Sequence, residues 1–250
     1  MRTKIIFEDR DILVIQKPAG LATQTARVDQ QDVVSELKNY LSGTSYLGVV
    51  HRLDQPVEGL LVFGKTKAAA ASLAAQLEHK DKDGTLNKRY DCVICGKASN
   101  KDDQLVDYLY KDSANRAVVL SAKGAEKEPR AKQASLHYHI LEEKAISTSE
   151  NLLMLTEDIH QLSPIYLSLA DIQIDTGRFH QIRAQMAHGG MFLLGDGKYG
   201  DDFTRKISEQ FGIRNVALCA YSLEFVHPVT KEKLHFQIKP QGKAFSYFSL

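Results

Sequence analysis

The chain has 250 residues, of which 43% are apolar and 25% are charged, and its formal net charge is +1. This length and composition indicate a globular protein of one large domain or two small ones. The near-neutral charge excludes the strong basic excess of a protein that binds nucleic acid without sequence preference. The odd number of cysteines, three, argues against a disulfide framework and favours a reducing compartment.

The amino terminus and the apolar segments predict a cytoplasmic protein without a membrane partner. Met1 to Lys4 leads directly into strand-like residues 5–7 and not into the apolar region of a secretory signal. No stretch approaches the roughly 18 uninterrupted apolar residues that a membrane-spanning helix needs.

The first elements predicted along the chain are two strands and a turn. Residues 5–8 and 12–16 have the composition of short strands, and the polar Asp9 to Asp11 between them is typical of a hairpin turn. The segment from Lys17 to Gly20 contains proline and glycine and therefore ends the second strand.

Helical and strand patterns alternate in the next segment. Apolar residues recur every three or four positions between 32 and 41, which predicts a helix that Asp29 or Asp32 caps. The apolar run at 59–64 predicts a strand. An alanine-rich helix is expected to follow it, from its cap Thr66 to about residue 80.

Beyond Gly84 the pattern is mainly that of strands. The expected strands are residues 90–95, 117–120, 135–141, 152–155, 166–174, 218–225 and 234–238. A short helix is predicted at 180–189, ended by Gly189 and Gly190 in the left-handed conformation, and the weakly patterned 142–164 is expected to be an insertion. The fold class is therefore α+β, with a mixed, mainly antiparallel sheet and flanking helices.

Four polar blocks carry a resemblance to a known family. They are Lys17-Pro18-Ala19-Gly20-Leu21, then His51-Arg52-Leu53-Asp54 with Gly59-Leu60-Leu61, the run from Thr176 to Arg183, and Gly195-Asp196-Gly197-Lys198-Tyr199-Gly200. Together they resemble the signature of RluA-type pseudouridine synthases. The resemblance implies a single catalytic domain over 1–250 with the pseudouridine synthase fold, and an isomerase that converts uridine to pseudouridine in structured ribosomal or transfer RNA. It also implies that the small amino-terminal RNA-binding domain of some relatives is absent.

Asp54 is the predicted essential residue. Its position between a loop and the start of a strand is common for catalytic groups, although an Asp before a turn is by itself more often a turn former. The resemblance implies that its carboxylate is required for cleavage of the glycosidic bond. A carboxylate that stays ionised in a pocket needs a fixed cation beside it, and by resemblance that cation is Arg183, whose planar guanidinium matches a carboxylate.

Other blocks supply the predicted RNA contacts. Tyr90, two residues after Lys88, matches a tyrosine that stacks on the target base in the family, and stacking suits any base. Arg52, His51, Lys88 and Arg178 are the candidate RNA-binding residues. His180, Asp196 and Tyr199 are expected to hold loops.

Two positions depart from the family pattern. Val57 and Glu58 stand where Thr and Ser are usual, and Glu58 introduces a carboxylate near the loop of Asp54. Phe179 stands where a small hydroxyl residue is usual. Substrate preference and loop geometry are the properties that these changes would affect.

No cofactor or metal is predicted, and no obligatory protein partner is evident. Phosphate-binding glycine loops are missing from the sequence, and Cys92 and Cys95 lie three apart in an expected strand, where they point to opposite faces. His137 and His139 share a strand face but lack a third ligand. Two rival functions remain: a non-catalytic RNA-binding or folding factor, and a glycoside hydrolase with Glu58 as the second acid.

Overall fold

The computed structural model describes residues 1–25, 29–42, 46–78, 86–146 and 164–249. They form two compact units, the first from Met1–Tyr90 with Cys219–Gln241 and the second from Asp91–Leu218 with Gly242–Leu250. Whether both act as one catalytic domain stays a prediction. Within the described ranges, none of the helices is long and apolar enough to cross a membrane.

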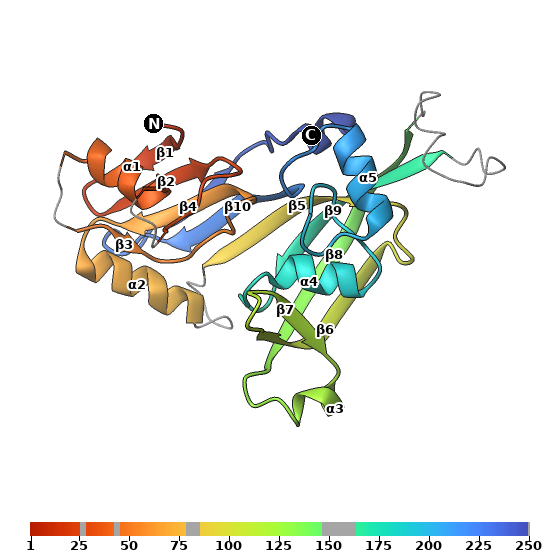
Figure 1. Ribbon diagram of the computed structural model, residues 1–250. Helices are drawn as coiled ribbons and strands as arrows, with labels where there is room; N and C mark the ends of the chain where they lie inside the picture. Colours follow the sequence, from red (N-terminus) through yellow and green to blue (C-terminus); the bar gives the residue numbers. More distant parts are fainter. Residues whose placement is uncertain (26–28, 43–45, 79–85, 147–163, 250) are drawn as a thin grey trace. The chain divides into compact units, whose positions relative to one another are not determined.

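The first unit contains a mixed sheet with strand order β1-β2-β4-β10, on which β3 pairs with β4 and β11 with β10 (Figure 1). The strands are β1 (Lys4–Glu8), β2 (Ile12–Lys17), β3 (Gly48–Val49), β4 (Glu58–Gly64), β10 (Leu218–Val226) and β11 (Lys233–Gln237). β4 and β10 run parallel, whereas β1–β2, β2–β4, β3–β4 and β10–β11 are antiparallel. The predicted hairpin is confirmed, because Asp9 Oδ1 accepts the backbone N–H of Asp11 and of Ile12, each at 2.8 Å.

Both faces of β2 and β4 are covered, as expected of central strands. One face contributes Ile12, Val14, Leu60 and Val62, which pack with Ala69 and Leu73 of α2 (Lys67–Glu78). The alternate residues Leu13, Ile15, Leu61 and Phe63 are also fully buried. The strands of this unit therefore read as continuous apolar runs and not as an alternation.

The two helices of the first unit begin at the predicted caps. Asp32 accepts the Ser35 backbone N–H at 2.7 Å at the start of α1 (Val33–Tyr40), and Thr66 Oγ1 accepts the Ala69 N–H at 3.1 Å before α2. Each cap satisfies a backbone donor that the first turn of a helix leaves without an internal partner.

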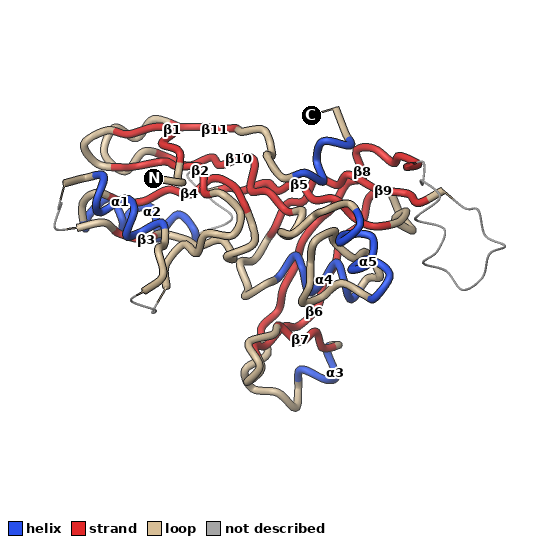
Figure 2. The backbone as a smooth tube through the Cα atoms, turned by 45° about the horizontal axis from the view of Figure 1, so that its top comes forward, coloured by secondary structure: helices blue, strands red, loops and turns tan. Residues whose placement is uncertain are grey.

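The second unit contains strands in the order β5-β9-β8-β6-β7. The strands are β5 (Asn87–Cys95), which begins in the first unit, β6 (Asp102–Lys111), β7 (Ala117–Leu120), β8 (Lys132–Ile146) and β9 (Ile165–Ile174). Its helices are α3 (Ala122–Ala125), α4 (Gln181–His188), α5 (Asp202–Gln210) and the 3-10 helix η2 (Lys243–Tyr247). Figure 2 shows α4 beside the β6–β7–β8 strands, where Ala184 packs against Leu109, Ala117 and Ala134.

The α+β class and the mainly antiparallel sheet are confirmed, but several elements differ from the prediction. β3, β6, α3, α5 and η2 were not predicted. β8 continues to Ile146, so residues 142–146 are strand and not the start of an insertion, and the expected strand at 152–155 lies outside the described residues. The helix expected at 180–189 is present over Gln181–His188, with His180 at its N-cap. Of the two glycines expected in the left-handed conformation, Gly190 adopts it with a φ of +75°, whereas Gly189 has a φ of −76°.

Candidate active site

Asp54 lies in the loop between β3 and β4, and bonds on both sides of it hold this loop in place. Before it, the carbonyl oxygen of Leu53 accepts a hydrogen bond from the Thr23 hydroxyl at 3.0 Å, and the backbone N–H of Leu53 donates to the same hydroxyl at 3.2 Å. After it, the carbonyl oxygen of Gln55 accepts the Gly20 N–H at 2.8 Å. The half-buried carboxylate of Asp54 is thus carried by a backbone with little freedom to move, which is what a preorganised catalytic group requires.

Lys17 completes this clamp from inside the unit. Its side chain is fully buried, and Nζ donates to the carbonyl oxygens of Pro18 at 3.1 Å, Leu21 at 2.7 Å and Gln55 at 3.2 Å. Three acceptors match the three N–H bonds of an ammonium group. The lysine therefore joins the end of β2 to the residue that follows Asp54.

Burial lowers the pKa of Lys17 to about 7, although the charges of Asp54 and Glu58 oppose this change. The unfolded value is 10.5, so between these two pH values the unfolded chain binds more protons and stability rises with pH. Below the lower value the ammonium is charged in both states, and the full cost of burying it is present.

We expect Lys17→Met to remove this rise in stability between about pH 7 and pH 10. The measurement is the free energy of unfolding in urea over this pH range for wild type and variant. Buried thiols and phenols make stability fall with pH, but their contribution is the same in both proteins and cancels in the difference. Lys4→Met, the same change at an exposed position of the first unit, is the matched control. Parallel pH profiles for wild type and Lys17→Met would contradict the prediction.

The His51 side chain is buried, with 8% exposure, and bonds the backbone of the protein. Its Nε2 accepts the Val62 backbone N–H at 3.3 Å, and its Nδ1 has no hydrogen-bond partner among the residues that the structure describes. Burial, and then the charge of Lys88, lowers the pKa of His51 well below its ordinary value, so the ring is neutral at neutral pH. This geometry favours a structural role, and a contact between His51 and RNA stays a prediction.

Tyr90 lies in β5 and belongs to the same unit as Asp54. Its side chain is 5% exposed, and burial raises the pKa of its phenol, with a further rise from the charge of Asp54. The structure thus brings the two predicted residues close enough for their electrostatic interaction to matter. Arg52 is exposed and Lys88 is half-buried in this unit.

Arg183 lies in α4 of the second unit. It is held there by the carboxylate of Asp196, which was expected from the sequence only to hold a loop. Its Nε donates to Asp196 Oδ2 at 2.7 Å and its Nη2 to Asp196 Oδ1 at 2.8 Å, and the two side chains are only 6% and 1% exposed. Burial alone would raise the pKa of Asp196, but the bonds and charge of Arg183 and two backbone N–H groups lower it. Because Asp54 belongs to the other unit, its pairing with Arg183 stays a prediction.

The turn before α4 is built around the side chain of Gln181. Its Oε1 accepts the Arg178 backbone N–H at 2.9 Å and the Thr176 hydroxyl at 2.7 Å, and its Nε2 donates to Ser135 O at 2.9 Å. Arg178 itself is exposed, and its Nε donates a hydrogen bond to the carbonyl oxygen of Gln133 at 2.9 Å. The backbone N–H of Arg178 is therefore already hydrogen-bonded within the protein.

Comparison with known proteins identifies the family to which these residues belong. The sequence profile described as RNA pseudouridylate synthase matches residues 11–188. The chain belongs to this family. The earlier prediction of an RNA pseudouridine synthase is thus confirmed at the level of the family.

Relatives within the pseudouridylate synthase family match nearly the whole chain. "Ribosomal large subunit pseudouridine synthase D" of Zymomonas mobilis is 30% identical over 93% of this chain and 68% of its own length. "Ribosomal large subunit pseudouridine synthase C" of Vibrio cholerae is 28% identical over 92% and 63%, respectively. The chain therefore spans about two thirds of the length of these relatives.

Solved structures show the same fold. "Human RNA Pseudouridylate Synthase Domain Containing 1" matches with a TM-score of 0.70 at 19% identity, over 95% of this chain and 83% of that one. "Human RNA Pseudouridylate Synthase Domain Containing 4" matches with a TM-score of 0.68 at 20% identity, over 97% and 92%. The expected pseudouridine synthase fold is confirmed.

Glu58, one of the departures from the family pattern, is buried in β4 at 4% exposure. Both of its carboxylate oxygens accept the backbone N–H of Gln241, at 3.0 and 3.1 Å. This carboxylate binds the end of the first unit's chain, which argues against its use as the second acid of a glycoside hydrolase. Gly59 beside it has a φ of +137°, and a Cβ there would lie 2.5 Å from the Ala220 backbone nitrogen.

A cluster of possible metal ligands, Asp9, Asp11 and His227, lies in the first unit, with ligand atoms within 4.8 Å of one another. His227 Nδ1 accepts the N–H groups of Val229 at 3.2 Å and Thr230 at 3.0 Å. The other nitrogen, Nε2, must then carry the proton that it donates to Asp9 Oδ2 at 2.9 Å. This is the geometry of a structural hydrogen bond, because a metal would need a lone pair at Nε2.

The cysteines behave as buried or half-buried thiols. Cys92 and Cys95 lie in β5 as expected, and burial raises the pKa of both, that of Cys95 to about 11. His137 and His139 are exposed, and each faces its own carboxylate, His137 at 3.3 Å from Asp175 and His139 against Asp102.

Sequence reasoning missed Lys17, Gln181 and the role of Asp196 as the partner of Arg183. Lys17 and Gln181 both lie inside blocks that resemble the family signature, and that membership was the available signal. Their functions depend on acceptors that are distant in the chain, such as Gln55 for Lys17 and Ser135 for Gln181.

Proposed function

We propose that this protein isomerises uridine to pseudouridine in structured ribosomal or transfer RNA, with Asp54 as the essential carboxylate. The observation that carries the proposal is the presentation of Asp54: a half-buried carboxylate on a loop held by Thr23, Gly20 and Lys17, with the buried ring of Tyr90 within range of its charge. Family membership supports the same reaction.

The reaction rearranges the substrate without adding or removing atoms. The bond between uracil N1 and ribose C1′ breaks, the uracil turns, and a bond forms between its C5 and C1′. The proton on C5 leaves and N1 gains one, so no cofactor is required. Asp54 begins the reaction either by attack on C1′ or by removal of the proton on C2′, and Tyr90 stacks on the base.

In this proposal Arg183 orients Asp54 and stabilises its negative charge. Within the second unit, the pair with Asp196 uses Nε and Nη2 of the guanidinium. A target in a loop or unpaired segment is favoured, because extruding a base from a duplex costs about a few kcal/mol. Arg52, Arg178 and Lys88 are the proposed contacts to RNA.

The test is a map of pseudouridines, by chemical modification and primer extension, in RNA from cells with the gene deleted and then restored. Because the relatives named above are ribosomal large subunit pseudouridine synthases, large-subunit ribosomal RNA is the first RNA to examine, with transfer RNA second. We expect one or more defined sites to disappear on deletion and to return on restoration. An unchanged map, with purified protein inactive on both RNAs, would favour the non-catalytic RNA-binding alternative.

A further inference from the structure

Phe179 is an exposed aromatic ring in the turn before α4, where the resembled family usually has a small hydroxyl residue. Its side chain is 39% exposed. A single exposed apolar residue is common and needs no explanation. The surroundings of this ring are what distinguish it.

A chain of aromatic contacts fixes the orientation of the Phe179 ring. The ring stacks on His180 with 3.7 Å between centroids and 21° between planes. His180 Nδ1 bonds the Tyr199 hydroxyl at 2.8 Å, and the same hydroxyl accepts the Ala117 backbone N–H at 2.7 Å. His180 also has a φ of +52°, a left-handed conformation that is costly for a residue other than glycine. The fold thus accepts backbone strain at the residue that supports the Phe179 ring.

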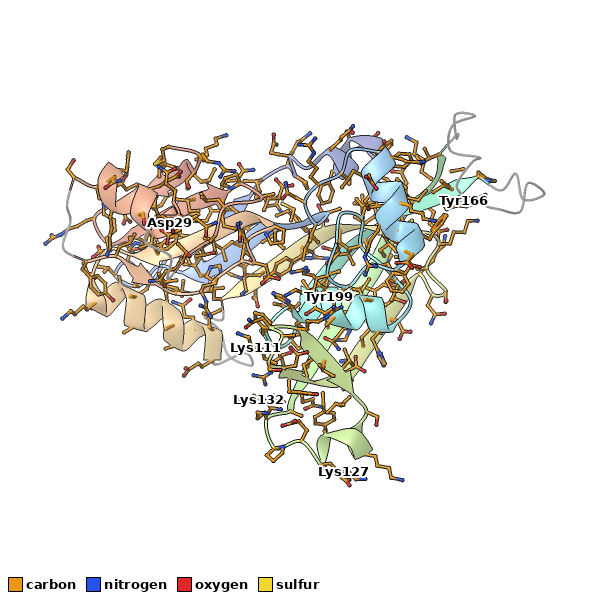
Figure 3. All side chains as sticks on the ribbon, in the orientation of Figure 1. Asp29, Lys111, Lys127, Lys132, Tyr166 and Tyr199 are labelled. Atoms are coloured by element: carbon orange, nitrogen blue, oxygen red, sulfur yellow. The ribbon has the colours of Figure 1, made fainter. Side chains whose placement is uncertain are left out.

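Cations surround this aromatic cluster. The Lys111 ammonium lies 4.7 Å from the centroid of Phe179, and the Arg116 guanidinium lies 5.6 Å from that of Tyr199. Arg178, adjacent in sequence to Phe179, is exposed. Figure 3 shows Tyr199, Lys111 and Lys132 following one another along the same side of the second unit.

Two carboxylates on this surface are bound within the unit. Asp112 Oδ1 accepts the Arg116 backbone N–H at 2.7 Å, and Asp175 Oδ2 accepts the Ser135 hydroxyl at 2.5 Å. These bonds do not neutralise the carboxylates, but the three cations Lys111, Arg116 and Arg178 outnumber them, so the formal charge of this group is positive although the whole chain has a net charge of only +1.

We propose that Phe179 and Lys111 bind one unpaired nucleotide of the RNA substrate, its base stacked on Phe179 and its phosphate paired with Lys111. In the protein without RNA the ammonium covers the ring through a cation–π contact. The long, flexible stem of lysine allows the ammonium to leave the ring for a phosphate when a base takes its place. An aromatic ring interleaved with cations is the arrangement by which proteins bind single-stranded RNA without reading its sequence.

This inference rests on the proposed function only in taking RNA as the partner, and its test does not require turnover. The probe is a short single-stranded RNA of cytidines with one 2-aminopurine, whose fluorescence falls when the base stacks on a ring. It contains no uridine, so isomerisation cannot alter it. We expect wild-type protein to bind the probe and quench it.

Four variants test the contributions of the Phe179 ring and of the Lys111 charge to binding separately. We expect Phe179→Thr to weaken binding about fivefold or more and to abolish quenching, whereas Phe179→Tyr should retain both. Lys111→Met should weaken binding and reduce the salt dependence by about one unit of slope. Phe203→Thr, at a 46% exposed ring of α5 in the same unit, is the matched control and should bind like wild type.

Equal affinity and equal quenching for wild type and Phe179→Thr would overturn the inference, as would a wild type that does not bind the probe. Thermal melting of Phe179→Thr should match wild type, because the ring is exposed. If the isomerase activity is present, the same variant should raise KM for RNA and leave kcat unchanged. A wild type that binds and quenches without isomerising any RNA would refute the proposed function and leave this inference intact.

Discussion

Asp54→Asn should abolish pseudouridine formation, with a fall in turnover of at least about a thousandfold. Asparagine keeps the shape of the side chain but has neither the charge to attack ribose nor the basicity to remove a proton. A positioned acid or base alone contributes about 10²- to 10⁴-fold. The measurement is single-turnover formation of pseudouridine on the RNA identified by mapping. RNA binding and thermal melting are measured beside turnover to show that the variant is folded and still binds, and the backbone bonds that hold the loop do not involve the Asp54 side chain.

The matched control for this prediction is Asp29→Asn, the same change at an exposed aspartate of the first unit. It should retain full turnover. Turnover retained by Asp54→Asn itself would show that another group performs the chemistry and would refute the assignment of Asp54.

Asp196→Asn should have the second largest effect, because it removes one charge of a buried ion pair. Breaking such a pair costs about 3 to 5 kcal/mol of stability, and here Asp196 bonds Arg183 with both oxygens. If Arg183 orients Asp54, the variant should also lose kcat by more than about tenfold, with little change in KM, when assayed well below its melting temperature.

The pH dependence of stability gives a second readout for Asp196. Its pKa in the folded protein is below the unfolded value of 3.8, so the pair stabilises the fold above about pH 4 and loses this contribution as the pH falls through the folded value. Asp196→Asn should remove that acid-dependent loss, as measured by thermal melting between about pH 2 and pH 7.

Asp201→Asn is the matched control for Asp196→Asn. Asp201 caps α5 by accepting the Thr204 N–H at 2.7 Å, and because asparagine also caps helices well, this variant should lose little stability and no kcat. If kcat of Asp196→Asn equals that of wild type at a temperature where both are folded, Asp196 stabilises the second unit without positioning the catalytic groups.

Local sequence patterns were sufficient to predict turns and helix caps, because these are formed by residues that are neighbours in the chain. The turn at Asp9 closes on the amides of Asp11 and Ile12, and Asp32 caps the helix that starts at the next residue. In each case the side chain and its partner lie within three positions, so the sequence pattern contains the whole interaction.

The elements that were missed have weak patterns of their own. In β6, Val106 is 51% exposed while the carboxylate of Asp107 turns inward to bind Gln185 Nε2 at 2.8 Å. The alternation that marks a half-buried strand is therefore disturbed. β6 is a strand because β7 and β8 pair with it, and pairing of this kind is not visible in a single segment.

The sequence by itself determined the family and the identity of the proposed catalytic residue, because both depend on short blocks that keep their spacing along the chain. Only the tertiary structure decided how those residues are held. Lys17 reaches Gln55, 38 positions away, and Arg183 reaches Asp196, 13 positions away. Lys111 of β6 meets Phe179 before α4. Such partners are brought together by strand pairing and by burial of apolar faces, both of which couple residues far apart in the chain, and no local pattern specifies them.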